Sequence, residues 1–382
     1  MDFELTNRQK HIRMAAREFA EGELMAIGQE CDVKEDFPRE LVKKAAQLGF
    51  VGPFINKEYG GLGLGYLEYA IIAEELWRVD PGLGLVICAS TFGSEELLLF
   101  GSEEQKKKYL PLLTKGDWIC GFSITEPEAG SDTASALTRA EHMGDEYVIN
   151  GNKVFITNGT IANFLLVFCL THPDATSKSK RHSIILVETN REGFKADKIH
   201  GKMGIRASDT ANIYFNNVRV PKENLIGVEG NGFIQLMKFF DQTRAGVGAF
   251  GVGLARGALE QAIHYVKKRK QFGQTIGSFQ VTQFKVAEMA TLIETARALT
   301  YKACWGIDHR KAEPQLSAMA KWWAGHVAVR VADEALQLHG GYGYIGDYSA
   351  ERFYRAAKIL EIFEGTKEIE KMIIGRRSLG IS

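Results

Sequence analysis

The sequence predicts an α+β protein with a helical N-terminal domain, a β-rich middle domain and a helical C-terminal domain. Three observations support this order: helical apolar spacing in the first third, strand patterns in the middle, and long amphipathic runs after Gly232. We expect domains at residues 1–118, 119–232 and 233–382. A chain of 382 residues is long enough for two or three domains with a substantial core.

Helix-start signals mark the first segment. Thr6 and Gln9 form a possible capping box, and Ser102 with Gln105 forms a second one. The N-terminus lacks the features of a signal or transit peptide. The longest apolar stretch, Phe164–Leu170, is too short to span a bilayer. We therefore expect a soluble, cytoplasmic protein without membrane insertion.

The strand patterns are clearest around the Asn150-Gly151 pair. This pair stands between β-rich arms, which predicts a hairpin over residues 147–156. Three more segments have strand character: Phe164–Leu170, Ser183–Glu188 and Ile213–Val220. The middle region is therefore predicted to be a β domain.

The C-terminal region contains long amphipathic runs at residues 253–268, 281–304 and 315–338. It also contains a G-x-G-x-x-G match at residues 246–251, which suggests a dinucleotide fold only where a strand precedes it. The preceding segment, 233–244, has helical spacing, and no β-α-β alternation surrounds it. Close packing of a buried helix explains the glycines better, so a nicotinamide dehydrogenase is the weaker rival class.

Charge and metal-ligand spacing exclude other classes. Lys+Arg and Asp+Glu both number 47, so the net charge is zero and no nucleic-acid partner is favoured. The five cysteines contain no C-x-x-C pair, which suits a reducing compartment. The nine histidines lack H-x-x-x-H and H-E-x-x-H spacing, so we predict no metal.

Glu364 is the candidate catalytic residue. It lies in the segment FEGTK, after a helical pattern at residues 347–362 and before Thr366, which can N-cap the next helix. Apolar neighbours would desolvate the carboxylate and raise its pKa toward the range of a general base, roughly 6 to 7. An isolated Glu-Gly is more often a solvated helix end, so the assignment depends on the rest of the chain.

Six segments occur in an order that resembles the acyl-CoA dehydrogenases across nearly the whole chain. They are TEPEAGSD at 125–132, FITNG at 155–159, DQTR at 241–244, RKQFG at 269–273, QLHGG at 337–341 and FEGT at 363–366. Each segment alone has a bland explanation as a turn-rich loop, a core aromatic or a surface charge. The resemblance implies a middle β-barrel or sandwich, a C-terminal four-helix bundle and FAD as cofactor.

The resemblance implies that FAD lies between the β domain and the C-terminal helices. Residues expected to contact it from the middle domain are Phe122, Ile124, Thr125, Gly130, Ser131, Phe155, Ile156 and Thr157. Many relatives have Trp where this chain has Phe155. Residues expected to reach the FAD from elsewhere, several of them from a neighbouring subunit, are Arg269, Phe272, Gln280, Gln337, Leu338, Gly340, Gly341, Thr366 and Glu368. The resemblance therefore also implies a homotetramer built as a dimer of dimers.

The implied reaction is α,β-dehydrogenation of an acyl-CoA thioester, with Glu364 taking the α-proton and hydride passing from Cβ to flavin N5. In the family the backbone N–H of the base and a ribityl hydroxyl of FAD stabilise the thioester oxygen. The implied substrate contacts are Thr91, Ser131, Asp241, Arg244 and Gly365. Some relatives place the base immediately before the Arg of the D-x-x-R segment. Thr243 stands there and cannot serve, which leaves Glu364.

Departures from the family pattern bear on the substrate. Relatives commonly have Tyr and Asp where this chain has Phe363 and Ala356, and those that take dicarboxylates carry an Arg in the segment matching residues 85–92, which has no cation here. A second carboxylate would be costly to bury there. We expect a short, branched or cyclic apolar acyl group, with an electron-transferring flavoprotein as the acceptor usual in the family.

Three alternatives share the implied fold: an acyl-CoA oxidase, an enoyl-CoA reductase and a non-catalytic CoA-binding scaffold. Retention of Glu364 and of the flavin segments argues against the scaffold, because a scaffold would not require them.

Overall fold

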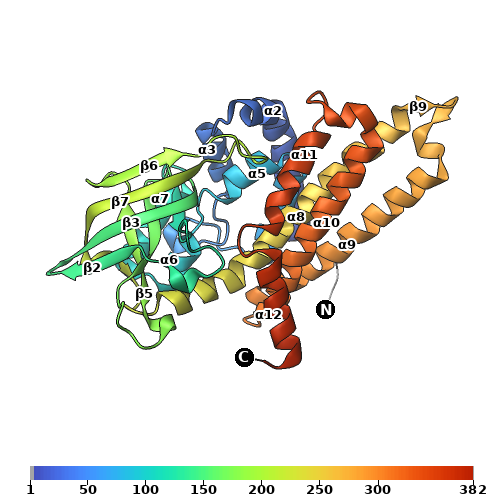
Figure 1. The fold of residues 1–382 in the computed structure, drawn as a ribbon. Coiled ribbons are helices and arrows are strands. Elements are labelled where there is room, and N and C mark those ends of the chain that lie inside the picture. Colours follow the sequence, from blue (N-terminus) through green and yellow to red (C-terminus); the bar gives the residue numbers. More distant parts are fainter. Residues whose placement is uncertain (1–3, 382) are drawn as a thin grey trace.

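A computed structural model describes residues 4–381. Figure 1 shows a twisted sheet on one side, long C-terminal helices on the other, and N-terminal helices between them. The N-terminal helices are α1 Asn7–Phe19, α2 Met25–Lys34, α3 Arg39–Gln47, α4 Tyr66–Val79, α5 Pro81–Cys88, α6 Ser94–Phe100 and α7 Glu103–Thr114. Both predicted capping boxes are confirmed: the Thr6 hydroxyl caps α1 with Gln9, and the Ser102 hydroxyl caps α7 with Gln105.

The middle region forms one mixed eight-stranded sheet. Its strands are β1 Cys120–Ser123, β2 Arg139–Met143, β3 Glu146–Thr157, β4 Phe164–Leu170, β5 His182–Glu188, β6 Phe194–Lys198, β7 Thr210–Pro221 and β8 Leu225–Ile226. The strand order is β6-β7-β3-β2-β4-β5-β8, and β1 pairs with β4 in parallel. Residues alternate along β4: Leu165 and Val167 enter the core of the sheet, while Phe164 and Leu166 join the core shared with the helices. The sheet is therefore apolar on both faces at its centre.

The hairpin expected at Asn150-Gly151 is wrong. Strand β3 runs straight through this pair, and both of its arms pair with β7 across a register shift between Ile149 and Gly151. Gly151 has a φ of 145°, and a Cβ there would lie 2.7 Å from the Thr138 Cα, so the glycine serves a bulge and a close approach. The hairpin in this region instead joins β2 to β3, where Met143 pairs with Glu146.

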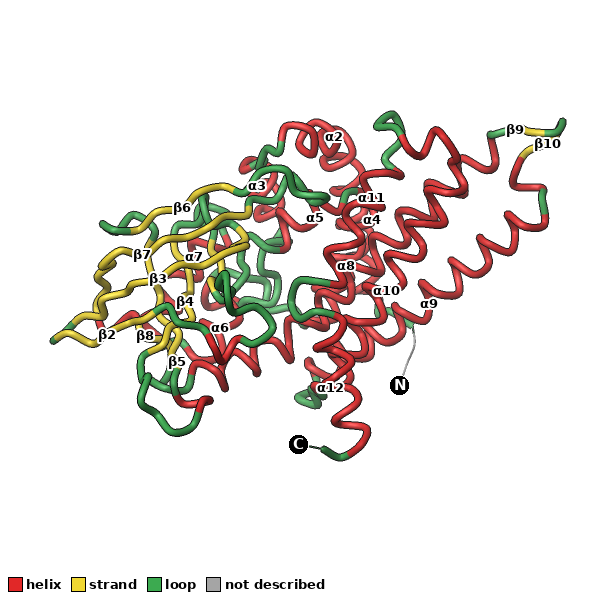
Figure 2. The backbone as a smooth tube through the Cα atoms, viewed as in Figure 1, coloured by secondary structure: helices red, strands yellow, loops and turns green. Residues whose placement is uncertain are grey.

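The C-terminal region is helical apart from one small hairpin. Its elements are α8 Gly232–Lys268, β9 Lys270–Gln271, β10 Gln274–Thr275, α9 Gln280–Asp308, α10 Pro314–His339, α11 Ala350–Ala357 and α12 Lys367–Leu379. Figure 2 shows α8 running from beneath the sheet to the β9–β10 hairpin at the far end of the helices. The helix predicted over residues 347–362 is shorter, because after α11 the chain tightens into a 3₁₀ turn, Lys358–Glu361.

The G-x-G-x-x-G segment lies inside α8. A Cβ on Gly246 would come within 2.7 Å of the Tyr69 ring, and one on Gly251 within 2.6 Å of the Ala324 carbonyl oxygen. These glycines therefore allow α4 and α10 to approach α8 closely, as the sequence predicted, and the residues directly before them belong to the same helix rather than to a strand.

The structure type changes from helix to strand between Thr114 and Cys120, and from strand to helix between Ile226 and Gly232. The predicted domain boundaries lie at these junctions, although the boundaries themselves stay a prediction. Among residues 4–381, no helix combines the length and apolarity that a membrane span requires. No cluster of three metal-ligating His, Cys, Asp or Glu side chains occurs in that range.

Candidate active site

Glu364 occupies a left-handed turn between α11 and α12. Its φ is 56°, and that of Gly365 is 99°. Thr366 then begins α12, with its hydroxyl accepting a hydrogen bond from the Ile369 N–H at 3.4 Å, which confirms the predicted N-cap. In Figure 1 this loop lies on the side of the C-terminal helices that faces the sheet. A non-glycine residue with positive φ is uncommon, so surrounding contacts must hold this turn.

Two adjacent residues of α8 contact Glu364. The Thr243 hydroxyl donates a hydrogen bond to Oε2 of the Glu364 carboxylate at 3.0 Å. Arg244 Nε donates to the Glu364 carbonyl oxygen at 3.3 Å. The carboxylate and the backbone of the same residue are thus held from one helix, which fixes the direction of the side chain.

Burial raises the pKa of Glu364 to about 7, and the Thr243 hydroxyl and the charges of Arg244 and Lys321 counteract part of this rise. The direction is the one expected from the apolar neighbours in the sequence. A carboxyl group with a pKa near neutrality exists in both forms under ordinary conditions, so it can accept or donate a proton.

Sequence reasoning missed three buried charged side chains around this turn. Lys321 of α10 donates a hydrogen bond to the Gly365 carbonyl oxygen. Glu370 of α12 forms an ion pair with Arg244 at 3.1 Å. Glu95 of α6 is buried, and burial together with the Glu364 charge raises its pKa to about 8. A lysine within the apolar run around Ala320 and Trp322 was the one available signal, because a fully buried lysine is rare unless paired.

A second group of predicted residues gathers where β1 ends beside the end of β3. The Val154 N–H donates to the Thr125 carbonyl oxygen at 2.9 Å. The buried Lys153 Nζ donates to the Ile124 carbonyl oxygen at 2.7 Å and lies 3.0 Å from the Glu126 carboxylate. These bonds hold the loop after β1 against β3.

Phe155 projects outward from this place. The register shift between Lys153 and Ile156 gives Phe155 a φ of 60° and leaves its side chain 67% exposed, whereas Ile156 is buried. Just beyond, the Asn158 side chain donates to the carbonyl oxygens of Ala89 and Cys120 at 2.7 and 2.9 Å. The bulge therefore presents a flat aromatic face on a rigid support.

A chain of ring contacts links this second group to the Glu364 turn. The ring centroids of Phe122 and Phe239 lie 5.0 Å apart, and those of Phe239 and Phe240 lie 5.6 Å apart. The Arg244 guanidinium lies 5.0 Å from the centre of the Phe240 ring. Strand β1 and the Glu364 turn are thus both positioned by α8.

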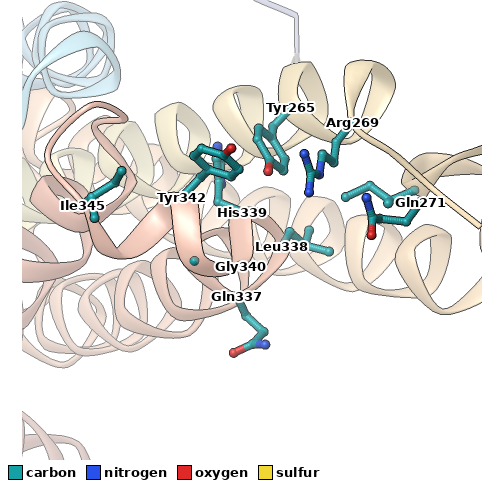
Figure 3. Close-up of a pocket in the computed structure, with 11 residues that line it drawn as sticks. Tyr265, Arg269, Gln271, Gln337, Leu338, His339, Gly340, Tyr342 and Ile345 are labelled. Atoms are coloured by element: carbon teal, nitrogen blue, oxygen red, sulfur yellow. The ribbon is translucent and has the colours of Figure 1, made fainter.

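A third group lies at the other end of α8. Arg269, Leu338, Gly340 and Gly341 line a pocket of about 510 Å³, together with Tyr265, Gln271, Ile276, Gln337, His339, Tyr342 and Ile345. In Figure 3 Arg269 lies between Tyr265 and Gln271, while the Gln337 side chain points away from it. The Arg269 guanidinium lies 5.4 Å from the centre of the Tyr342 ring. Phe272, at the hairpin tip, is 93% exposed, and Gln280 at the start of α9 is also exposed.

The remaining predicted residues are dispersed. Thr91 is buried and bridges to Cys120 of β1. Asp241 is half-buried, and its carbonyl oxygen accepts a hydrogen bond from the Ser317 hydroxyl at 2.8 Å. Gly130, Ser131 and Glu368 are exposed. The binding roles expected for all of these residues, including Arg244, stay predictions.

Comparison with known proteins agrees with this arrangement. Three family descriptions match consecutive parts of the chain: the N-terminal, middle and C-terminal domains of acyl-CoA dehydrogenase, at residues 6–117, 121–218 and 230–379.

Relatives match nearly end to end. The chain is 44% identical to the short-chain specific acyl-CoA dehydrogenase of Clostridium acetobutylicum, over 98% of each chain. It is 43% identical to the acryloyl-CoA reductase (NADH) of Anaerotignum propionicum, over 98% of this chain and 95% of the relative. A solved structure from work on the electron transferring flavoprotein of Acidaminococcus fermentans superimposes with a TM-score of 0.96 at 42% identity, over 99% of this chain and 100% of the other. The chain therefore belongs to the acyl-CoA dehydrogenase family of FAD-dependent oxidoreductases.

Proposed function

We propose that this chain catalyses α,β-dehydrogenation of a short acyl-CoA thioester, with Glu364 as the base that removes the α-proton. The observation that carries the proposal is the Glu364 carboxylate itself, desolvated in a left-handed turn and held by Thr243 at 3.0 Å. Burial raises its pKa to about 7, so a proton acceptor is available at neutral pH.

The residues present fit FAD. The exposed Phe155 ring offers a face for a flat heterocycle, and the nearby Thr125 and Thr157 supply hydroxyls and backbone groups. Arg269 and the Gly340-Gly341 pair can receive a pyrophosphate, since a guanidinium forks onto phosphate oxygens and glycines let backbone amides approach. When bound, FAD supplies a two-electron acceptor for the hydride that leaves Cβ.

The protein residues then act on the proton and on the carbonyl. Glu364 takes the α-proton, and its backbone N–H donates to the thioester oxygen, which stabilises the developing enolate charge. Thr243 orients the carboxylate by donating to Oε2. Asp241 and Arg244, which belong to the same helix as Thr243, are the proposed contacts for the CoA moiety.

The acyl group is proposed to be short, branched or cyclic, and apolar. The segment from Leu85 to Phe92 offers no cation for a second carboxylate. Glu95, next along the chain, has a pKa raised to about 8 and is therefore mostly uncharged at neutral pH. The short-chain specific relative from Clostridium acetobutylicum, at 44% identity, favours the same range.

We further propose that two copies of the chain complete each site. Arg269, Phe272 and Gln280 lie at the hairpin end of α8, whereas Glu364 contacts the middle of that helix. An α-helix rises about 1.5 Å per residue, so the 25 positions from Arg244 to Arg269 separate the groups by roughly 37 Å. A neighbouring subunit can supply the second group to the same FAD, which favours an assembly of at least two chains. The family resemblance then favours a homotetramer built as a dimer of dimers.

Reduction of an enoyl-CoA is the second candidate. It is favoured by the relative named acryloyl-CoA reductase, at 43% identity. The same residues serve in that direction, with protonated Glu364 delivering the proton to Cα. An electron-transferring flavoprotein is the proposed electron partner in either direction, as the match to the Acidaminococcus fermentans work suggests.

Anaerobic titration of the purified flavoprotein tests the proposal. Butyryl-CoA and cyclohexanecarboxyl-CoA should bleach the flavin absorbance, while glutaryl-CoA should not. Crotonyl-CoA added to the reduced enzyme tests the reverse direction, and oxygen as acceptor tests an oxidase. Absence of bleaching by every acyl-CoA, with FAD bound, would contradict the proposed reaction.

A further inference from the structure

Three charged side chains from three helices converge beneath the Glu364–Gly365 turn. Arg244 comes from α8, Lys321 from α10 and Glu370 from α12, with exposed fractions of 5%, 1% and 0%. Charged groups are almost never fully buried unless they are paired. Their burial at one turn therefore calls for an explanation beyond general packing.

Each of the three groups contacts the turn or a neighbour that does. Lys321 Nζ donates to the Gly365 carbonyl oxygen. Arg244 Nε donates to the Glu364 carbonyl oxygen at 3.3 Å and lies 3.1 Å from Glu370 Oε1. Two consecutive carbonyl oxygens of the turn are thus bound by two buried cations, which fixes the backbone of both left-handed residues.

Glu370 lies directly against the turn. Gly365 has a φ of 99°, which favours glycine, and a Cβ there would come within 2.2 Å of Glu370 Oε1 and displace this carboxylate. Within the described residues, neither carboxylate oxygen of Glu370 has an aligned hydrogen bond, and the ion pair with Arg244 is its direct charged contact. The carboxylate therefore acts mainly through its charge and its bulk.

We propose that Lys321 and Glu370 are positioning residues for Glu364, which act through the Gly365 carbonyl oxygen and through Arg244 to hold the turn and balance the charge beside the carboxylate. This inference rests on the proposed function, since it assigns the cluster to the service of the base.

The charged groups around Glu364 affect its pKa, and this pKa can be measured to test the proposal. Burial raises the pKa of Glu364, and the positive charges of Arg244 and Lys321 offset part of that rise. Burial, with a smaller contribution from the negative charge of Glu364, raises the pKa values of Glu370, Glu95 and the Tyr66 hydroxyl.

Two further acidic residues, Glu361 and Asp241, surround Arg244, Lys321 and Glu370. Lys321 faces Glu361 in addition to Glu364, Glu370 and Arg244, and Glu370 faces Asp241. Because Lys321 lowers the pKa of Glu364 from close range, loss of the Lys321 charge should raise that pKa. Burial raises the pKa of Glu370 to about 7, so Glu370 is only partly charged while Glu364 titrates, and loss of its carboxylate should lower the Glu364 pKa by less. A role in packing alone, without charge, would not produce opposite shifts.

The test measures α-proton abstraction without hydride transfer. In 3-thiabutyryl-CoA a sulfur replaces the β-carbon, so the bound ligand can lose its α-proton but cannot give up a hydride. The long-wavelength absorbance of its anion against oxidised flavin, followed against pH in the holoenzyme, reports the apparent pKa. Lys321→Met should raise this value by about half a unit or more, and Glu370→Gln should lower it by a smaller amount.

Matched controls are Lys115→Met and Glu192→Gln, which remove exposed charges elsewhere. FAD content should be unchanged in all variants, and Lys321→Arg should restore most of the wild-type profile. If Lys321→Met fails to fold, the downward shift in Glu370→Gln still decides the matter. Unchanged values, or shifts of the same sign, would overturn the inference while leaving the base assignment intact. A wild-type enzyme that never develops the absorbance and is never bleached by an acyl-CoA would overturn the proposed function itself.

Discussion

The Glu364 turn and the Arg269 pocket are both recognisable in the sequence, yet their polar groups are satisfied differently. At the turn, Arg244, Lys321 and Glu370 are buried and bound to one another or to the backbone. At the pocket, Arg269 is exposed and contacts the face of Tyr342. The turn takes its charged partners from the same chain, whereas the pocket leaves its guanidinium exposed beside an aromatic ring. Such a difference is expected where one site is assembled from two copies.

The largest effect is expected when the Glu364 carboxylate is removed. Glu364→Gln should lower the rate of flavin reduction by about 10²- to 10⁴-fold, because an amide cannot take the α-proton. FAD content should be retained, since Glu364 itself is not a proposed FAD contact and glutamine has nearly the same size. Stopped-flow bleaching with butyryl-CoA measures the effect, and Glu192→Gln, at an exposed position, is the control. Substantial residual activity would refute Glu364 as the base.

The second prediction concerns Arg269 in the pocket at the hairpin end of α8. Arg269→Ala should weaken FAD binding by roughly 10- to 100-fold, the cost of losing a charge-assisted hydrogen bond to phosphate. FAD retention on dialysis measures it, and the exposed Arg13→Ala is the control.

Mixing the two variants then tests whether sites are shared. At an FAD concentration too low to load Arg269→Ala alone, random pairing of Glu364→Gln with Arg269→Ala chains in a dimer should restore about a quarter of wild-type activity, because half of the dimers hold one intact site of two. No gain on mixing would show that each chain completes its own site.

The pH profile tests the electrostatics of the turn. With a pKa raised to about 7, Glu364 is mostly protonated at pH 6, about half ionised at pH 7 and mostly ionised at pH 8. The rate of dehydrogenation should therefore rise about tenfold from pH 6 to pH 7.5 and then level off. Reduction of an enoyl-CoA needs the protonated form, so its rate should fall over the same range. A dehydrogenation rate that is flat between pH 6 and pH 8 would contradict the assignment.

The smallest effect is expected at Thr243. Thr243→Val removes the hydroxyl that donates to Glu364 Oε2 at 3.0 Å, so the pKa of Glu364 should rise further. At pH 7 the rate should fall by roughly two- to tenfold and should largely recover at pH 9. Thr176→Val, at an exposed loop position, is the control. A loss that is equal at both pH values would point to damage of the turn rather than to titration.

Much of the fold was predictable from local pattern. The hydroxyl caps at Thr6, Ser102 and Thr366 depend on residues three positions apart, and the strand Phe164–Leu170 is apolar throughout. The Asn150-Gly151 pair misled, because its local turn preference lost to pairing of both flanking arms with β7. Local signals are reliable where local contacts decide the structure.

The site was predictable only in part for the same reason. Glu364 was found because its segment matches a family motif. Lys321 and Glu370 belong to no motif: Lys321 is far from Glu364 in the sequence, and Glu370 lies in the helix that follows it. Glu370 follows Thr366 by one helical turn, where an exposed first-turn acid is the ordinary expectation. Its burial depends on how α8, α10 and α12 meet, which no single segment encodes.

The contact between the Thr243 hydroxyl and the Glu364 carboxylate has a consequence for the history of such enzymes. The side chains of Thr243 and Glu364, which are 121 residues apart in the sequence, meet at the same place in the site. An acid attached to the helix could reach the place now served from the loop, and the loop would then be free of its need for an acidic side chain in an unfavourable backbone conformation. The acidic residue can therefore be carried by either the helix or the loop in different enzymes, while the position of the carboxylate in the site stays the same.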